Sequence, residues 1–364
     1  MRAIAEEIAR VCEAGESACL ATLIHSVGSV PMSQRAKLLV RADGSLAGTI
    51  GGGCLEAEVW QLAREVIGEG RGRCLSVRLD QAAAAAEGLV CGGRVEILLE
   101  PVGGAETAAF YREVAALLAG GGRAVLATPV DPADAPGGHL LVRADGSLVG
   151  GLDDASMQAA VVAAAPEVLA AGVPRLAVCA PGATGLQAAG APGRRVFLEP
   201  LAPEPTLLIF GAGHVGLATA RMGALVGMRV VVVDDRAEFA HRARFPGAEA
   251  VVVESFTDAF ARFTPDESTF IVIVTRGHQH DETVLAQALR TPARYVGMIG
   301  SRRKVAVIFR RLREQGFSEA ELARVRAPIG LAIGADTPEE IAVSILAEVI
   351  AVRRGAWREA LSVR

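Results

Sequence analysis

The sequence of 364 residues contains no asparagine, only two lysines and few aromatic side chains, which make up 4% of the chain. It also lacks any uncharged apolar run of the roughly 18 residues that a membrane span needs. The first residues carry Glu6 and Glu7, where a signal peptide would be basic and then apolar. These absences predict a soluble, cytoplasmic protein that does not bind a membrane.

An excess of positive charge is also missing. The formal net charge is -4, whereas general nucleic-acid-binding domains are usually basic, so we expect no nucleic-acid partner. Hydrophobic residues make up 51% of the chain and charged residues 21%, which is typical of a folded protein with a sizeable core. The length predicts two or three domains.

The cysteines are few and form no CxxC pair, which argues against a disulfide scaffold and a structural zinc site. Four of them lie in apolar strand or helix patterns and are expected in the core: Cys12, Cys19, Cys74 and Cys179. The other two, Cys54 and Cys91, lie among glycines, where a thiol can be reactive or bind metal. Small buried thiols remain the alternative for both.

A proline cluster, LEPLAPEPT, divides the chain after about residue 201. Beyond it, continuous apolar β-branched runs alternate with amphipathic helical stretches. Such runs are typical of parallel strands that are covered on both faces. We predict a Rossmann-like, doubly wound parallel sheet in a domain of residues 206–355, with strands at 206–210, 229–233, 250–253, 269–274 and 294–298.

The preceding part of the chain contains an internal repeat. LLVRADGSL occurs at 38–46 and again at 140–148, each time as a strand, an Asp-Gly turn and a return strand. GGRVEILLEP, ending at Pro101, is echoed by GRRVFLEP, ending at Pro200. We therefore predict an N-terminal α/β domain, residues 1–201, with duplicated units at about 15–102 and 120–201.

The repeat provides its own control, because GTIGGGCLEAEV (48–59) aligns with GGLDDASMQAAV (150–161). The second copy replaces the thiol of Cys54 by a serine and the charge of Glu56 by a glutamine. Glycines before a helix let a ligand approach the backbone and leave the first N–H groups open. The first copy is therefore predicted to bind a ligand, through Cys54, Glu56 and three glycines that the second copy replaces: Gly51, Gly52 and Gly53.

The C-terminal domain carries a GxGxxG motif, directly after a predicted strand and at the start of a helix. Its glycines suit a tight turn, close approach of a pyrophosphate and helix packing, in the order Gly211, Gly213 and Gly216. Asp234 ends the next strand, where an acid would bind a ribose hydroxyl of NAD. The nearby Arg236 leaves NADP open, and a Rossmann fold without a ligand is the alternative.

Histidines follow two of these strands. His214 lies at the start of the first helix, where it would either donate to a phosphate or be an exposed helix residue. His278 and His280, in TRGHQHDE, could bind a metal or transfer protons, but a solvated loop is the favoured interpretation.

A second anion-binding loop is predicted in GMIGSRRK. Ser301 is placed to cap the helix, and Arg302, Arg303 and Lys304 crowd its positive end, where a bound anion would offset their repulsion. Gly300 precedes the cap. A solvated basic helix is the alternative.

The last long helix should start at a capping box formed by Thr337 and Glu340, with Pro338 as its first residue. Its apolar residues recur every four positions, so the helix is structural or contacts a second protomer, which makes a homodimer plausible.

Several of these segments together resemble the XdhC/CoxI family, over about 20–102 and 206–354: VGSVP (27–31), GTIGGGCLEAEV, LVCGGRVEILLEP, FGAGHVG, VVVDDR, GMIGSRRK and APIGLAIGADTPEEIAVSILAE. Members of that family are accessory proteins of molybdenum hydroxylases such as xanthine dehydrogenase and carbon monoxide dehydrogenase. The resemblance implies a chaperone, rather than an enzyme. Such a chaperone binds molybdenum cofactor, shields it during sulfuration by a cysteine desulfurase and inserts it into the apo-hydroxylase.

On this resemblance Cys54 would contact molybdenum, with Cys91 as a weaker candidate. The loops at 211–216 and 300–304 would hold the phosphate of molybdopterin or the pyrophosphate of its dinucleotide form. The residues by themselves also allow an NAD(P)-dependent oxidoreductase with a cysteine-containing substrate domain.

Overall fold

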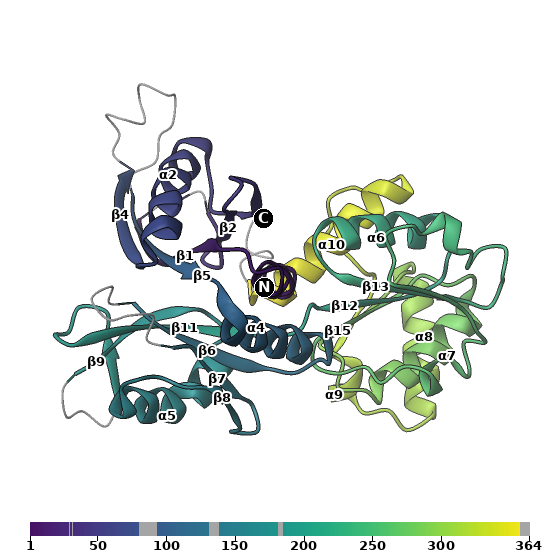
Figure 1. The fold of residues 1–364 in the computed structure, drawn as a ribbon. Helices are drawn as coiled ribbons and strands as arrows, with labels where there is room; N and C mark the ends of the chain where they lie inside the picture. Colours follow the sequence, from purple (N-terminus) through teal and green to yellow (C-terminus); the bar gives the residue numbers. More distant parts are fainter. Residues whose placement is uncertain (29, 31, 80–92, 131–137, 181–184, 357–364) are drawn as a thin grey trace. The chain divides into compact units, whose positions relative to one another are not determined.

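The computed structural model describes residues 1–28, 30, 32–79, 93–130, 138–180 and 185–356 (Figure 1). The chain divides into two compact units, Met1–Pro203 and Glu204–Arg364. Within the described ranges, no helix is long and apolar enough to cross a membrane.

The first unit contains two antiparallel sheets whose strands have corresponding orders. The first sheet has the order β3-β2-β1-β5-β4, with β1 (Ala18–Gly28), β2 (Lys37–Arg41), β3 (Leu46–Thr49), β4 (Arg73–Leu79) and β5 (Gly93–Val102). The second has the order β10-β9-β11-β6-β7-β8, with β6 (Ala124–Pro129), β7 (Leu140–Arg143), β8 (Leu148–Gly150), β9 (Arg175–Cys179), β10 (Leu186–Ala188) and β11 (Arg194–Leu201). Read from β8, the second sheet repeats the first and adds β10 at its edge.

Helices occupy equivalent places in both copies. The third strand of each copy leads into a long helix, α2 (Gly53–Glu69) or α5 (Ala155–Ala171). Each sheet is also preceded by a helix, α1 (Arg2–Glu13) or α4 (Gly104–Ala119), and these two helices pack against each other. The predicted α/β duplication is thus confirmed at the level of element order, with a leading helix that the repeat pattern did not include.

The two hairpins that carry the repeated motif have the same local structure. Asp43 Oδ1 accepts hydrogen bonds from the main-chain N and the hydroxyl of Ser45, at 2.8 and 2.6 Å. Asp145 Oδ1 accepts the same pair from Ser147, at 2.9 and 2.7 Å. The glycine between them adopts a left-handed conformation in both turns, which glycine tolerates best.

The second unit is built on a six-stranded parallel sheet of order β14-β13-β12-β15-β16-β17, the order of a Rossmann fold. Its strands are β12 (Thr206–Phe210), β13 (Arg229–Asp234), β14 (Ala250–Val253), β15 (Thr269–Ile273), β16 (Tyr295–Met298) and β17 (Val325–Arg326). The predicted doubly wound sheet is confirmed. The pattern missed β17, because a strand of two residues is too short to show periodicity.

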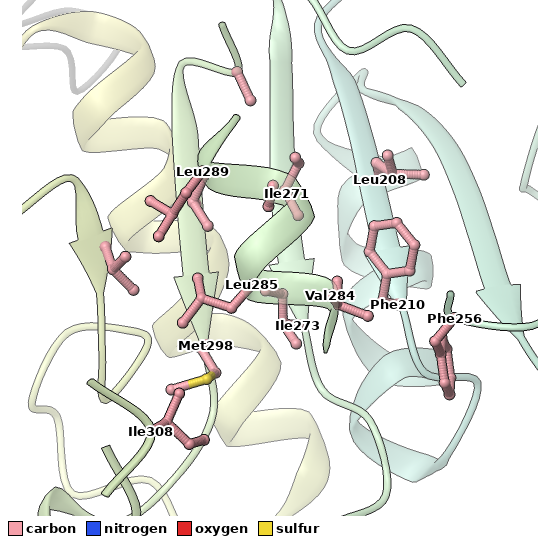
Figure 2. Packing of buried hydrophobic residues seen from close by; sticks show 14 of the residues in the cluster. Leu208, Phe210, Phe256, Ile271, Ile273, Val284, Leu285, Leu289, Met298 and Ile308 are labelled. Atoms are coloured by element: carbon pink, nitrogen blue, oxygen red, sulfur yellow. The ribbon is translucent and has the colours of Figure 1, made fainter. Parts of the chain in front are cut away.

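Helices cover both faces of this sheet (Figure 1). The side chains of β12 alternate between the two faces, so Leu207 and Ile209 pack with α6 (His214–Leu225) and α10 (Pro338–Arg354). On the other face, Leu208 and Phe210 belong to the cluster that includes α7 (His278–Leu289) and α8 (Arg302–Glu314), as Figure 2 shows. Three shorter helical segments complete the unit: Arg242–Arg244, Ala259–Ala261 and α9 (Glu319–Leu322).

The capping box at the start of α10 is present: the Thr337 hydroxyl accepts from the Glu340 N–H, at 3.2 Å. Ile345 and Val349 are fully buried, and α10 packs on α6. The apolar stripe of this helix is therefore used inside its own unit and provides no argument for a dimer.

Candidate functional site

The helices α2 and α5, which are equivalent in the two copies, begin differently. Asp154 caps α5 by accepting hydrogen bonds from the N–H groups of Ser156 and Met157, at 2.9 and 3.0 Å. Gly52 occupies the same position before α2, where none of the described side chains caps the helix. The first N–H groups of α2 therefore lack the acceptor that the second copy supplies, and a ligand could take its place.

The three glycines before α2 differ in whether the fold requires a glycine at their position. Gly51 has a φ of 126°, a conformation that disfavours a side chain. A Cβ atom added to Gly52 or to Gly53 would meet nothing within 4 Å, so neither packing nor backbone conformation requires glycine there. These two positions leave open space beside the helix N-terminus.

Glu56 has a structural role that its charge did not reveal. Its Oε1 accepts hydrogen bonds from the Thr49 hydroxyl and the Ile50 N–H, at 2.6 and 3.1 Å. Gln158 Oε1 accepts from the Leu152 N–H in the second copy, at 2.9 Å. Glu56 therefore holds the glycine loop in place, and the second copy does the same without a charge.

Cys54 is the second residue of α2, but its side chain lies outside the described part of the structure, as does the whole of Cys91. Of the four cysteines expected in the core, Cys12, Cys19 and Cys179 are buried, whereas Cys74 is only half-buried. Burial raises the pKa of the Cys19 thiol to about 12, which makes it an unreactive thiol.

In the second unit, the GxGxxG loop joins β12 to α6 beside β15, where the strand order reverses and Rossmann folds bind ligands. A Cβ atom on Gly211 would lie 2.4 Å from the Val274 carbonyl oxygen, and one on Gly216 would lie 1.9 Å from the Gly211 carbonyl oxygen. A Cβ atom on Gly213 would meet nothing within 4 Å. Packing thus explains the first and third glycines, whereas the second leaves room for a ligand.

Asp234 is only 1% exposed, and both of its carboxylate oxygens already accept hydrogen bonds. Oδ2 accepts from the Ala212 N–H at 2.8 Å, and Oδ1 accepts from Arg236 Nε at 2.9 Å. Burial alone would raise the pKa of Asp234, but hydrogen bonds from Arg236 and from main-chain N–H groups lower it. Asp234 therefore connects the glycine loop to β13. Its carboxylate oxygens already accept hydrogen bonds within the protein, which disfavours a role in binding a ribose hydroxyl.

Arg244, which the sequence did not single out, also supports this loop. Its Nη1 donates to the carbonyl oxygens of Ala212 and Phe239, at 2.9 and 2.6 Å. The only signal in the sequence was an arginine in a polar segment, which is too common to predict such a role.

The second predicted anion loop starts α8. The Ser301 hydroxyl accepts from the Lys304 N–H at 3.3 Å, so the predicted cap is present. The Lys304 ammonium pairs with Asp281, which is fully buried and accepts from the Thr275 hydroxyl at 2.6 Å. Lys304 is thus already neutralised by Asp281, and Arg302 stays exposed at the helix start. Gly300 lies directly under the Lys304 side chain.

The histidine segment is helical where a loop was expected. His278 is the first residue of α7, and the ring of His280 lies 5.2 Å from that of Phe256. The side chain of His278 lies outside the described part of the structure. His214, the first residue of α6, is exposed. Throughout the described residues, no three His, Cys, Asp or Glu side chains gather as a metal site would require.

A group of ionisable residues inside the first unit was missed. Lys37 Nζ lies 3.0 Å from Glu199 Oε2, and His139 Nε2 lies 3.7 Å from Glu100 Oε1. The internal repeat contained the evidence for this group. Lys37 and His139 precede the two LLVR segments, and Glu100 and Glu199 each precede the proline of an LEP segment.

Comparison with known families identifies both units. The family described as "XdhC and CoxI family" matches residues 11–80 and 108–179, and the "XdhC Rossmann domain" matches residues 207–349. The chain belongs to the XdhC/CoxI family. The two N-terminal XdhC/CoxI segments fall on the two structural copies, so the family pattern also covers much of 103–200, which no sequence motif explained.

Individual XdhC/CoxI relatives differ in how much of them is matched. The uncharacterized protein YqeB of Escherichia coli is 35% identical over 222 residues, which are 60% of this chain but only 41% of YqeB. A probable xanthine dehydrogenase subunit from Bacillus subtilis is 26% identical over 345 residues, 93% of this chain and 94% of that protein. The molybdenum cofactor insertion chaperone PaoD of Escherichia coli is 25% identical over 342 residues, 93% of this chain and 84% of PaoD.

One solved structure has the same fold over nearly the whole length. It is described as a xanthine dehydrogenase from Bacillus halodurans and covers 96% of both chains, with a TM-score of 0.76 and 23% identity. The names of these relatives give no support to NAD(P) as a ligand.

Proposed function

We propose that this protein is a chaperone that binds molybdenum cofactor and inserts it into an apo-hydroxylase of the xanthine dehydrogenase or carbon monoxide dehydrogenase type. Likeness to PaoD over 84% of that chaperone supports the role. The observation that carries the proposal is the start of α2: Gly52 leaves open the N–H groups that Asp154 closes in the second copy.

The residues present suit a phosphorylated, sulfur-liganded cofactor. Open N–H groups at a helix start favour an anion, and a cysteine in the same turn has its thiolate favoured by the helix dipole. When bound, the cofactor would supply molybdenum and a pterin phosphate. Cys54 would contact the metal, Cys91 would assist, and Glu56 would keep the loop in position.

The loops 211–216 and 300–304 of the second unit would hold the phosphate of molybdopterin or the pyrophosphate of its dinucleotide form. Gly213 leaves space at the loop 211–216, and Arg302 is exposed beside the loop 300–304. We assign this role to residues 206–355 and the metal contact to residues 1–201. A cysteine desulfurase as sulfur donor, a homodimer and a cytoplasmic location are parts of the same proposal.

The test is to produce the protein in cells that make the cofactor, purify it without oxygen, and measure bound molybdenum and pterin. Cys54→Ser should lose most of the molybdenum, because a hydroxyl is a poor ligand for a soft metal site. Cys74→Ser is the matched control, since this half-buried cysteine lies in β4.

Cofactor retained equally by both variants would remove Cys54 from the site. Absence of cofactor in all preparations, with NAD bound instead, would favour an NAD(P)-dependent oxidoreductase. In that case NAD affinity should be lost in Asp234→Ala. The hydrogen bonds that Asp234 already accepts from Ala212 and Arg236 argue for the chaperone.

A further inference from the structure

The ionisable cluster of the first unit follows the duplication. Each copy contributes a threonine on its first strand and a basic residue before the next: Thr22 Oγ1 lies 3.2 Å from Lys37 Nζ, and Thr128 Oγ1 lies 3.3 Å from His139 Nδ1. Each copy also contributes a glutamate on its last strand. Glu100 stands opposite Leu20 in the first sheet, as Glu199 stands opposite Leu126 in the second.

The contacts between ionisable groups in this cluster are formed between the copies. Lys37 of the first copy pairs with Glu199 of the second, and His139 of the second faces Glu100 of the first. The arrangement is therefore a pseudo-twofold pair of contacts, with lysine in one and histidine in the other.

The two contacts differ in exposure. The Lys37 and Glu199 side chains are 7% and 4% exposed, and their 3.0 Å separation satisfies the charge of the carboxylate. The His139 and Glu100 side chains are 21% and 17% exposed and line a cavity of about 670 Å³, which is large enough for a small heterocyclic ligand.

Glu100 lacks the partners that Glu199 has. Its carboxylate accepts no hydrogen bond from the described residues, and His139 Nε2 lies 3.7 Å from Oε1. Burial raises the pKa of Glu100 to about 7, despite the attraction of Lys37. Burial, with Lys37, lowers the pKa of His139 to about 4, so that His139 is neutral and gives Glu100 no counter-charge.

The cavity walls suit a flat ring. Phe110 and Tyr111 of α4 line it, and the Phe110 ring stacks on that of His139 with centroids 5.4 Å apart. Gly150 and Gly151 also line it, and their backbone is held by the second sheet: Gly150 pairs with Leu140, and the Gly151 N–H donates to the His139 carbonyl oxygen at 3.0 Å. Aromatic side chains with a few polar groups are typical of pockets for planar, hydrogen-bonding ligands.

We propose that this cavity binds a 2-amino-4-oxopyrimidine ring, the ring shared by pterins and guanine. Its adjacent ring N–H and amino group would both donate to the Glu100 carboxylate, and the ring would lie against the aromatic wall of α4. The carboxylate oxygens accept two parallel hydrogen bonds, which is the geometry that this ring edge offers. The cavity is lined by Ile67 and Gly70 at the C-terminal end of α2, whereas Cys54 lies at its N-terminal end, so this ring site is separate from the proposed metal contact. The proposal rests on the proposed function only in that the cofactor is one source of a pterin ring.

The test is a titration of the purified full-length protein with pterin, guanosine, and lumazine, which has an oxygen in place of the 2-amino group of pterin. Pterin should bind at least tenfold more tightly than lumazine, because lumazine leaves the carboxylate without one donor and adds an acceptor facing it. Comparing the affinities for pterin and guanosine distinguishes the two natural sources of the ring. Because these comparisons use the unaltered protein, they do not depend on how a variant folds.

Glu100→Gln should weaken pterin binding about tenfold or more, since its amide presents only one acceptor. Glu113→Gln is the matched control: Glu113 is an exposed residue of α4 that pairs with the half-buried Arg143, so affinity should not change. In the wild type, affinity should rise between about pH 6 and 8 as Glu100 ionises, and Glu100→Gln should abolish that rise.

Equal affinity for pterin and lumazine, or an unchanged affinity in Glu100→Gln, would overturn the proposal. The result is separable from the chaperone test. Pterin binding that depends on Glu100 would stand even if no molybdenum is retained, and molybdenum lost only in Cys54→Ser would stand even if the cavity binds nothing.

Discussion

At the scale of single residues, the pair Glu100 and His139 shows how burial changes two ionisable groups in opposite directions. The pKa of Glu100 is raised to about 7 and that of His139 is lowered to about 4, in both cases chiefly by burial. Folding therefore favours the neutral acid beside the neutral imidazole, so the pair carries no net charge in a slightly acidic solution.

This opposition has a measurable consequence. Because the folded pKa of Glu100 exceeds its usual 4.5, its contribution to stability is lost as the pH rises from about 4.5 to about 7. Because the folded pKa of His139 is below its usual 6.5, its contribution is lost as the pH falls from about 6.5 to about 4. In the wild type these two opposite pH dependences of the free energy of unfolding cancel between about pH 4.5 and 6.5.

Replacing one of the two residues should leave only the pH dependence that the other residue gives to the free energy of unfolding. In Glu100→Gln the free energy of unfolding should rise with pH between about 5 and 6.5, and in His139→Asn it should fall, each by at most about 1.4 kcal/mol per pH unit. Urea unfolding of the three proteins across this range measures the slopes. Parallel curves would contradict the assigned pKa directions.

At the scale of elements, the equivalent helices α2 and α5 show how one of two similar loops can be open to a ligand while the other is closed. The start of α5 is capped by Asp154, which completes the helix internally, and the start of α2 is uncapped at Gly52. The fold tolerates both, because Gln158 and Glu56 hold the two preceding loops in the same way. A ligand site can thus arise in one copy without disturbing the framework.

The substitution Gly52→Asp should give α2 the N-terminal cap that Asp154 gives α5. We expect a gain in the free energy of unfolding of about 0.5 kcal/mol, because the carboxylate would accept from the first N–H groups of α2. The same carboxylate would occupy the anion position, so bound molybdenum and pterin should be lost. Thermal unfolding and metal analysis of one preparation measure both effects.

Asp154→Gly is the reciprocal control, since it uncaps α5 and should lower stability by a few tenths of a kcal/mol without changing cofactor content. A Gly52→Asp protein that keeps its cofactor would show that the N–H groups of α2 are not the binding groups.

At the scale of the molecule, the first unit is held together by contacts between its two copies. The packing of α1 against α4 supplies apolar contact, with Ile8, Val11, Tyr111 and Val114 in one buried cluster. The Lys37–Glu199 pair joins the same two copies by charge, inside a region from which water is excluded. Such a pair adds little stability relative to an apolar replacement, but breaking it leaves a buried charge.

Lys37→Met should therefore lower the stability of the first unit by about 3 kcal/mol, because Glu199 would remain buried without its cation. Trp60, whose indole donates to the Gly44 carbonyl oxygen at 2.9 Å, reports on this unit in a Trp357→Phe background. Urea unfolding followed by Trp60 fluorescence measures the loss.

Two further variants test the reason for that loss. Arg143→Met breaks the exposed pair with Glu113 and should cost under about 1 kcal/mol. Adding Glu199→Leu to Lys37→Met should recover most of the stability, and failure to recover would mean that packing, rather than the unpaired charge, causes the loss.

The amino-acid sequence alone determined the elements and the duplication. Continuous β-branched runs marked the parallel strands of the second unit to within about a residue, because such strands are buried on both faces. The repeated LLVRADGSL fixed the equivalence of the copies, and with it the contrast between Gly52 and Asp154.

Only the tertiary structure decided which charged groups meet. Lys37 is closer in sequence to Glu100 than to Glu199, yet it pairs with Glu199, because the pairing follows from how the second copy packs on the first. Asp234 and Lys304 looked available to a ligand in the sequence, but Ala212, Arg236 and Asp281 already engage them. A side chain's partners depend on long-range packing in three dimensions, whereas periodicity along the chain reports only which face of an element is buried.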